Sequence, residues 1–208
     1  MDRHGEDLAR GAGTLFLASA GTQVGPGHFG LLPDDGVEKF SCHYEGDLEK
    51  RGRSFLEIRP LLWTADGWPV AGENVREGIC QIRSQRTGTI LQAPSNANNG
   101  TPVQTARYLI LDNQKWTMTP VGGGLYKITG VASGNVLEAA GAATVLAPFA
   151  GADNQLWKLD QLSDGSYRIA SKLNQLALTA TIKISPGNGV ALQPFSGDEA
   201  QRWIVTAP

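Results

Sequence analysis

The chain has 208 residues, of which 18% are charged, and a formal net charge of −2 at pH 7. Because Lys and Arg cluster only at residues 50–53, the sequence lacks the basic surface that nucleic-acid binding requires. No apolar run approaches the length of a transmembrane helix, so no membrane partner is expected. The two cysteines, Cys42 and Cys80, lie in different segments, and we expect two small buried residues rather than a disulfide.

Residues 1–73 form a first segment that contains no copy of any repeat. We expect strands at 14–19, 38–45 and 54–63, a Gly-rich turn at 25–30 and a hairpin turn at Asp66-Gly67. Within 38–45, the apolar residues Phe40, Cys42 and Tyr44 alternate with Ser41, His43 and Glu45. Successive side chains point to opposite faces of a strand, so one face should be apolar and the other should carry His43.

This first segment is rich in apolar residues for its size. Those expected on its apolar faces are Leu15, Phe16, Leu17, Phe40, Phe55, Leu61, Leu62 and Trp63. A small sheet cannot cover all of them, so the C-terminal part of the chain or further sequence would have to do so. If they stay exposed, the segment should self-associate or dissolve poorly.

The second half of the chain repeats a Gln-x-Trp pattern three times, with the Trp residues spaced by 41 and 46 residues. The three copies end at Trp116, Trp157 and Trp203. Three further columns keep the same phase: Ile82, Ile128 and Ile169; Leu91, Leu137 and Leu178, each nine residues after its Ile; and Tyr108, Phe149 and Phe195, each eight residues before a Trp. A period of about 40 residues indicates stacked supersecondary units that share one core.

Three such units suit a β-trefoil, because a propeller needs at least about four blades to close. We therefore expect an all-β chain with a trefoil domain at 74–208, built from repeats 78–120, 121–162 and 163–208. Strand-like runs at 125–128 and 166–169 agree with this division. The three Trp residues should be buried, with the Gln residues satisfying backbone groups beneath them.

These repeats resemble the ricin-type lectin domains, which carry the same Gln-x-Trp pattern. In that family an Asp after the Leu of each repeat often holds the sugar, and an Asn before the Gln assists. The equivalent pairs here are Gln92 with Asn113, Glu138 with Asn154, and Thr179 with Ala200. The first repeat keeps only amides and the third has lost both acceptors. The resemblance therefore implies a sugar site at the second repeat, with Glu138, Asn154 and Gln155 as its polar residues.

Two further readings of these residues remain open at this stage. Phe149 is a candidate face for sugar stacking, although the threefold recurrence of its aromatic column favours burial in the core. Glu138 and Asn154 also fit a solvated acid and a turn residue, since Asp153-Asn154 has the composition of a turn.

The first segment resembles the last part of the five-bladed propeller of glycoside hydrolase family 43, the arabinanase and arabinofuranosidase group. The residues that carry this resemblance are Gly25-Pro26-Gly27-His28, Lys39-Phe40-Ser41-Cys42-His43-Tyr44, Arg53, Ile58-Arg59-Pro60-Leu61 and Asp66-Gly67-Trp68-Pro69. It implies that residues 1–73 are an incomplete portion of a propeller. It also implies an extracellular or periplasmic protein, although residues 1–7 are charged and show no apolar signal-peptide core.

In that family, the His of the Gly-Pro-Gly-His turn points to the propeller axis and helps hold a metal ion or an ordered water. The resemblance therefore implies Ca²⁺ or another metal near His28, whereas His43 is expected to be a polar strand residue. The chemistry resembles inverting hydrolysis, in which two carboxyl groups stand about 6.5–9.5 Å apart. The blades that supply these carboxyl groups have no match in this chain, so we assign no catalytic residue.

Together, the two resemblances predict the carbohydrate-binding C-terminal portion of an arabinanase-like glycosidase. The expected partner is a plant polysaccharide, arabinan or a related pentose glycan. One alternative is a structural trefoil cap that binds no sugar, which the degraded acceptor positions favour. Another is an active glycosidase that cleaves α-L-arabinofuranosyl linkages. Trefoils also serve as protease inhibitors and signalling ligands, so the fold alone does not decide.

Overall fold

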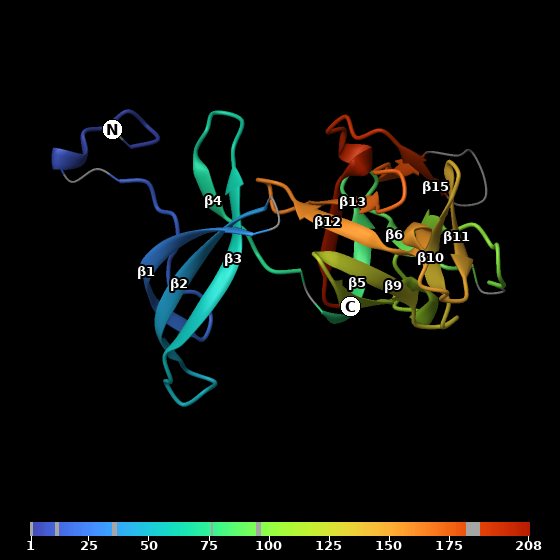
Figure 1. Cartoon of the computed structure of the whole chain (residues 1–208), viewed down its shortest axis with the longest axis horizontal. Helices are drawn as coiled ribbons and strands as arrows, with labels where there is room; N and C mark the ends of the chain where they lie inside the picture. Colours follow the sequence, from blue (N-terminus) through green and yellow to red (C-terminus); the bar gives the residue numbers. More distant parts are fainter. Residues whose placement is uncertain (1, 11–12, 35–36, 76, 95–96, 182–187) are drawn as a thin grey trace. The chain divides into compact units, whose positions relative to one another are not determined.

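The structure, a computed structural model, describes residues 2–10, 13–34, 37–75, 77–94, 97–181 and 188–208 (Figure 1). The chain divides into two compact units, Met1–Asn74 and Val75–Pro208, and the predicted boundary lies one residue before this division. Strands dominate both units, and the helical elements within the described ranges are four short 3-10 turns, the first at Leu8–Arg10 (η1). Among the described residues, no helix has the length and apolar content that crossing a membrane requires.

The first unit is a four-stranded antiparallel sheet with the strands in sequence order. Its strands are β1 (Gln23–Asp34), β2 (Val37–Asp47), β3 (Phe55–Trp63) and β4 (Pro69–Ala71). The turn at Asp66-Gly67 joins β3 to β4 as predicted, and Gly67 occupies the left-handed region with a φ of +80°. Each strand pairs with its neighbour in the chain, so local hairpins account for the whole sheet.

Strand β2 shows the predicted alternation of its two faces. Phe40, Cys42 and Tyr44 are buried and form a core cluster with Leu61. His43 and Glu45 lie on the opposite face, where His43 is partly exposed and Glu45 is exposed. The face that carries them is therefore not covered by the core cluster.

Two expectations for the first unit were wrong. Residues 14–19 form no strand, because this segment contributes Phe16 and Leu17 to the core cluster as side chains without a backbone ladder. Residues 25–30 are part of β1 and are not a turn. Strand β2 supplies a complete pairing partner for them, and the ladder absorbs one extra residue as a bulge between Gly27 and Gly30.

The apolar residues of the first unit are only partly covered. Phe40 and Leu61 are buried, and Phe16, Leu17 and Phe55 pack against them. Leu15 and Trp63, by contrast, are exposed.

The second unit contains twelve strands, four in each repeat. The first repeat holds β5 (Gly78–Ser84), β6 (Ile90–Gln92), β7 (Gln104–Ala106) and β8 (Trp116–Gly122). The second holds β9 (Leu125–Gly130), β10 (Val136–Ala140), β11 (Ala143–Ala147) and β12 (Trp157–Gln161). The third holds β13 (Tyr167–Ser171), β14 (Ala177–Thr181), β15 (Asn188–Gln193) and β16 (Trp203–Thr206).

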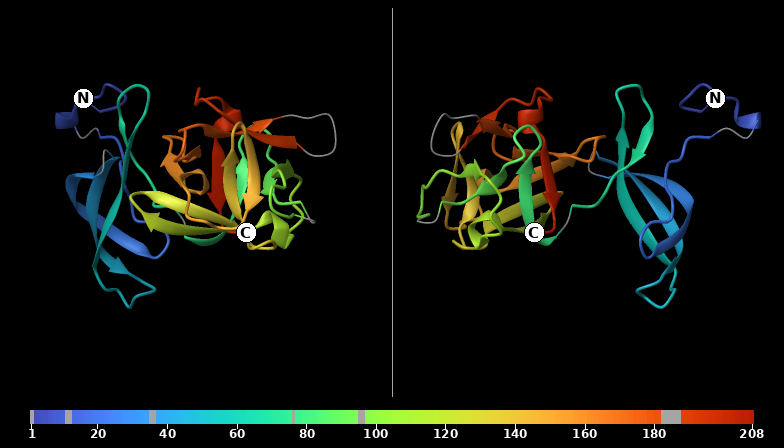
Figure 2. Two further views of the ribbon diagram at one scale, coloured as in Figure 1. Left: turned by 45° about the vertical axis from the view of Figure 1, so that its right-hand side comes forward. Right: turned by 180° about the vertical axis from the view of Figure 1, so that it is seen from behind.

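The first and last strands of each repeat form a closed ring. The order around it is β5, β8, β9, β12, β13 and β16, and β16 returns to β5 through the pairs from Trp203↔Ser84 to Thr206↔Gln81. The remaining strands form three hairpins, β6–β7, β10–β11 and β14–β15, which also pair with one another. The strands curl around a common centre (Figure 2). A six-stranded ring with three linked hairpins is the predicted β-trefoil.

The repeated apolar columns fill the centre of this ring. All three Trp residues have 0% exposure, as do the Ile and Leu columns that share their phase. Each Trp indole also donates a hydrogen bond to the backbone oxygen of the Leu in its repeat, at 2.8–2.9 Å. The predicted core role of these columns is confirmed, because burial and a satisfied indole N–H occur together in every repeat.

Candidate functional site

Each Gln of the Gln-x-Trp pattern ends a short 3-10 turn and points into the protein. The turns are Asp112–Gln114 (η2), Asp153–Gln155 (η3) and Glu199–Gln201 (η4). The three Gln side chains are at most 2% exposed. Buried amides must find partners, and the partners that these amides choose determine the geometry of the candidate sites.

In the second repeat, the amide of Gln155 joins strand β10 to the loop after β11. Its Nε2 donates to Glu138 Oε2 at 2.7 Å and to the backbone oxygen of Pro148 at 2.9 Å. Its Oε1 accepts from the backbone N–H of Ala150 at 2.7 Å. Gln155 therefore bonds to the backbone of the residues on either side of Phe149 and, through the same amide, to Glu138.

The Gln of each other repeat makes the same three kinds of hydrogen bond, and we call this arrangement the Gln clamp. Gln114 bonds to the side chain of Gln92, to the oxygen of Arg107 and to the N–H of Leu109. Gln201 bonds to the side chain of Thr179, to the oxygen of Pro194 and to the N–H of Ser196. The residue between the two backbone groups is Tyr108 in the first repeat and Phe195 in the third. Each Gln thus fixes a loop whose tip is the recurring aromatic residue.

The expectation that this aromatic column is core was wrong. Phe149 is 47% exposed, and Tyr108 and Phe195 are half-buried. The column recurs because the clamped loop presents its tip outward. Two of the rings each have a basic side chain over them. Lys127 Nζ, from β9, lies 4.9 Å from the centre of the Phe149 ring, and the Arg168 guanidinium, from β13, lies 5.1 Å from the centre of the Phe195 ring.

The second repeat brings the predicted polar residues together. The described contacts engage only one carboxylate oxygen of Glu138, which is half-buried, so the other oxygen can accept from a ligand hydroxyl. Asn154 donates to the oxygen of Ala139, the residue after Glu138, at 3.3 Å. Gln155 positions Glu138 and has little surface of its own. The chemistry of the site is thus one outward carboxylate oxygen, one amide and an exposed aromatic residue.

The first repeat has the same hydrogen-bond geometry but lacks the negative charge of Glu138. Gln92 accepts from Gln114 at 2.8 Å, and Asn113 donates to the oxygen of Ala93 at 2.9 Å. Both residues are half-buried. The amide of Gln92 fills the place of the Glu138 carboxylate, but its oxygen is the atom that Gln114 engages, so a ligand would meet an N–H donor here in place of a free carboxylate oxygen.

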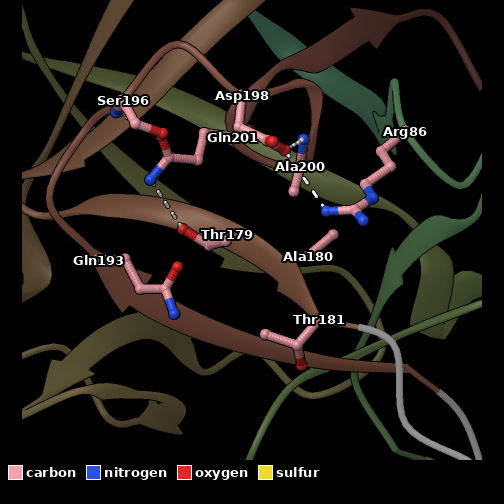
Figure 3. Close-up of a pocket in the computed structure, with 9 residues that line it drawn as sticks. All are labelled: Arg86, Thr179, Ala180, Thr181, Gln193, Ser196, Asp198, Ala200 and Gln201. Carbon is pink, nitrogen blue, oxygen red and sulfur yellow. Dashed lines mark hydrogen bonds and ion pairs between the residues drawn. The ribbon is translucent and has the colours of Figure 1, made fainter.

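A hollow of about 320 Å³ lies at the third repeat, where the sequence shows neither acceptor. It is lined by Arg86, Thr179, Ala180, Thr181, Gln193, Ser196, Asp198, Ala200 and Gln201. Thr179 is shorter than the Glu and Gln at the equivalent positions, which leaves space between the hairpin and the turn. Figure 3 shows Thr179 bonded to Gln201, and Asp198 bonded to the N–H of Ala200 and facing Arg86.

Sequence reasoning did not identify the residues of this hollow. Arg86 comes from the turn after β5 in the first repeat and reaches Asp198 at 3.5 Å. Asp198 directly precedes the turn that carries the third Gln, whereas Leu111 and Ala152 hold this position in the other repeats. An acidic residue at that position in one repeat alone is the sequence feature that could have identified it. The contact with Arg86 joins residues 112 positions apart, so no local pattern predicts it.

In the first unit, His28 lies beside His43 and Glu45, with one ligand atom from each within 4.8 Å of the others. The sequence singled out His28 but treated His43 as an ordinary polar strand residue. Their positions on neighbouring strands bring them together, because Gly27 pairs with His43 across the β1–β2 ladder.

The family model of the ricin-type beta-trefoil lectin domain-like proteins matches residues 112–193. The chain is also similar to ThreeFoil, a designed 3-fold symmetric protein, at 27% identity and a TM-score of 0.60, over 64% of this chain and all of ThreeFoil. SeviL, solved bound to asialo-GM1 saccharide, is 18% identical with a TM-score of 0.53, over 64% of this chain and 98% of SeviL.

A third similar structure extends beyond the trefoil. An exo-beta-1,3-galactanase from Clostridium thermocellum is 17% identical with a TM-score of 0.59, and the match covers 88% of this chain but only 46% of the galactanase. Val75–Pro208 is less than two thirds of the chain, so this match must include part of the first unit. The second unit is a β-trefoil, and residues 112–193 within it are similar to the ricin-type lectin domain-like proteins.

Proposed function

We propose that the second unit binds carbohydrate and that its second repeat is the binding site. The observation that carries this proposal is the network around Gln155, which holds Glu138 and the loop of Phe149 together. A sugar ring offers hydroxyl donors on its edge and apolar C–H groups on its face. A carboxylate oxygen and an exposed aromatic ring that one Gln side chain connects offer a partner for each.

The second repeat is favoured over the hollow at the third. Thr179 is 5% exposed, and its hydroxyl donates to the oxygen of Ala177 and accepts from Gln201. Asp198 is engaged by the N–H of Ala200 and by Arg86. Both contacts of Asp198 fall on Oδ1, so its other oxygen is open, but Arg86 partly neutralises this carboxylate and no aromatic residue is among those that line the hollow. Glu138, by contrast, has no basic partner among the described contacts and shares the Gln155 network with the loop of the exposed Phe149.

For the ligand, we infer a polysaccharide bound by a module of a glycoside hydrolase of family 43 type. The first segment's resemblance supports this, and the galactanase similarity supports it too because it includes part of the first unit. The resemblance alone points to arabinan or a related pentose glycan. The galactanase similarity points to a β-1,3-galactan, which we place first because it rests on the fold of both units.

The test compares Glu138→Gln with the native chain by affinity electrophoresis through gels containing β-1,3-galactan or arabinan. Losing a charge-assisted hydrogen bond should weaken binding by roughly tenfold or more. Stability should be unchanged, because Gln92 already makes the equivalent bond to Gln114 in the first repeat. Gln92→Glu is the converse variant, which should add a second site.

Gln193→Ala is the matched control, because Gln193 lines the hollow of the third repeat and should not affect retardation. If Gln193→Ala weakens binding and Glu138→Gln does not, the site lies at the third repeat. If neither polysaccharide retards the native chain, the unit is a structural trefoil and the proposed function is wrong.

A further inference from the structure

The open face of the first sheet gathers two imidazoles and one carboxylate. We propose that His28, His43 and Glu45 bind one divalent transition-metal ion such as Zn²⁺. His43 and Glu45 are two residues apart on β2 and therefore point to the same face, away from the core cluster of Phe40, Cys42 and Tyr44. The proposal concerns the first unit and does not depend on sugar binding by the trefoil.

His28 reaches this face because β1 is irregular at that residue. Gly27 pairs with His43, and the next residue of a regular strand would point to the core side. Instead, the bulge between Gly27 and Gly30 and a φ of +50° at His28 turn its ring to within 5.8 Å of the His43 ring, centre to centre. A non-glycine residue in the left-handed region is unfavourable, and such strain concentrates where a side chain must be aimed.

Two glycines on β1 leave room around these side chains. A Cβ on Gly25 would lie 2.8 Å from Cγ of Glu45, so the glycine is what allows the Glu45 side chain to cross the strand there. A Cβ on Gly27, the residue opposite His43, would meet no atom within 4 Å, so the space facing His43 is open. The two glycines therefore keep β1 side chains away from His43 and Glu45 on this face.

One nitrogen in this cluster lacks a partner. His43 Nδ1 is buried and makes no hydrogen bond within the part of the chain that the structure describes. Its nearest acidic atom is Glu45 Oε1 at 3.8 Å, which is beyond hydrogen-bonding distance. A metal ion between them would satisfy the nitrogen and draw the carboxylate inward.

The donor set selects the class of metal. Ca²⁺ takes six to eight oxygen ligands, and this cluster offers a single carboxylate. Two imidazoles with one carboxylate suit Zn²⁺, Ni²⁺ or Cu²⁺. The Ca²⁺ expected from the family resemblance is therefore a poor fit for these residues. Leu56, which pairs with His43 from β3, adds no ligand, so water would complete the coordination.

The side chains need a small movement to close on the ion. Ligands of a tetrahedral Zn²⁺ with bonds of about 2.1 Å lie about 3.4 Å apart, so separations of up to 4.8 Å must shorten. His28 and Glu45 are both exposed, so a rotamer change can achieve this without moving the core.

The test titrates the full chain with Zn²⁺, Ca²⁺ and Co²⁺, using calorimetry for Zn²⁺ and Ca²⁺ and absorption spectroscopy for Co²⁺. We expect one Zn²⁺ per chain and a Co²⁺ spectrum of nitrogen and oxygen ligands. The variants His28→Asn, His43→Gln and Glu45→Gln should each weaken Zn²⁺ binding by about tenfold or more, since even second-shell changes cost that much. Asn is chosen at residue 28 because it tolerates the left-handed backbone.

His4→Gln is the matched control, because it removes the third histidine of the chain and should leave Zn²⁺ affinity unchanged. Zn²⁺ binding that survives the cluster variants, or that His4→Gln abolishes, would overturn the proposal. So would Ca²⁺ binding as tight as Zn²⁺ binding. The Co²⁺ spectrum tests the native chain even if a variant does not fold: a thiolate charge-transfer band would assign the ion to Cys42 or Cys80 and reject the site.

Discussion

At the scale of single residues, the buried Gln of each repeat links stability to function. Gln155 satisfies two backbone groups of the loop around Phe149 and at the same time orients Glu138. A residue with 2% exposure therefore controls two groups that a ligand would contact. Its role is positioning, since the surface belongs to Glu138 and Phe149.

Gln155→Ala should lower both stability and sugar affinity. It removes two partly buried hydrogen bonds, from the N–H of Ala150 and to the oxygen of Pro148, and the loss of each costs about 1–2 kcal/mol. We expect the free energy of unfolding to fall by about 2–4 kcal/mol, measured by urea denaturation of the full chain. Gln193→Ala, which changes an exposed residue of β15, should stay within about 0.5 kcal/mol of the native chain. Equal effects of the two substitutions would contradict the clamp.

At the scale of elements, the carboxylate of Asp164, in the turn between β12 and β13, accepts hydrogen bonds from side chains of two other segments. Asp164 accepts from the N–H and hydroxyl of Ser166, from Arg202 at 2.8 Å and from Gln85 at 3.5 Å. Burial alone would raise the pKa of Asp164, but the hydrogen bonds from Ser166 and Arg202 outweigh it and the pKa is lowered. The ionised carboxylate is thus the form that the folded state prefers.

This lowered pKa predicts a pH-dependent contribution to stability. A carboxyl group with a folded pKa below its unfolded value of about 3.9 stabilises the fold above that pH and loses the effect as pH falls through the folded pKa. Asp164→Asn should cost about 1 kcal/mol at pH 7, and the difference from the native chain should shrink towards pH 3. Denaturant titrations at the two pH values measure this.

Asp153→Asn is the control for Asp164→Asn, because Asp153 is exposed and pairs with Lys172 at the surface. Exposed pairs contribute about 0–1 kcal/mol, so we expect a small effect at both pH values. A cost of Asp164→Asn that does not change between pH 7 and pH 3 would show that the charge of Asp164 is not what stabilises the turn.

At the scale of the whole molecule, the two units differ in the size of their hydrophobic cores. Among the residues that the structure describes, twenty buried residues form the core of the second unit, whereas four form that of the first. The division falls between Asn74, which donates to the oxygen of Ile58 in the first unit, and Val75, which packs against the core of the second. Each unit therefore has its own set of stabilising contacts.

This difference predicts two thermal transitions in calorimetry. The first unit should unfold at the lower temperature, because a small core buries less apolar area. Residues 75–208 expressed alone should unfold at the upper transition and keep the polysaccharide affinity of the full chain. Adding Zn²⁺ should raise only the lower transition, since the proposed ligands all belong to the first unit. A single transition, or unfolded residues 75–208, would contradict this division.

The threefold period and the alternation along one strand could be predicted from the sequence alone. Every repeat must bury the same apolar surface against a shared centre, so the columns of Trp, Ile and Leu had to recur in phase. Strand β2 alternates because its two faces meet different surroundings. The choice of the second repeat as the candidate site also came from residue types, since Glu138 is the acidic member of its column.

The tertiary structure decided which groups face outward and which meet. The period alone could not show that the aromatic column is exposed, because a clamped loop tip recurs as regularly as a core residue does. Contacts such as Arg86 with Asp198, or His28 with His43 and Glu45, join separate strands and loops through closure of the barrel and a bulge in β1. Local patterns predicted the buried columns of Trp, Ile and Leu, whereas sites form where distant backbone segments are brought side by side.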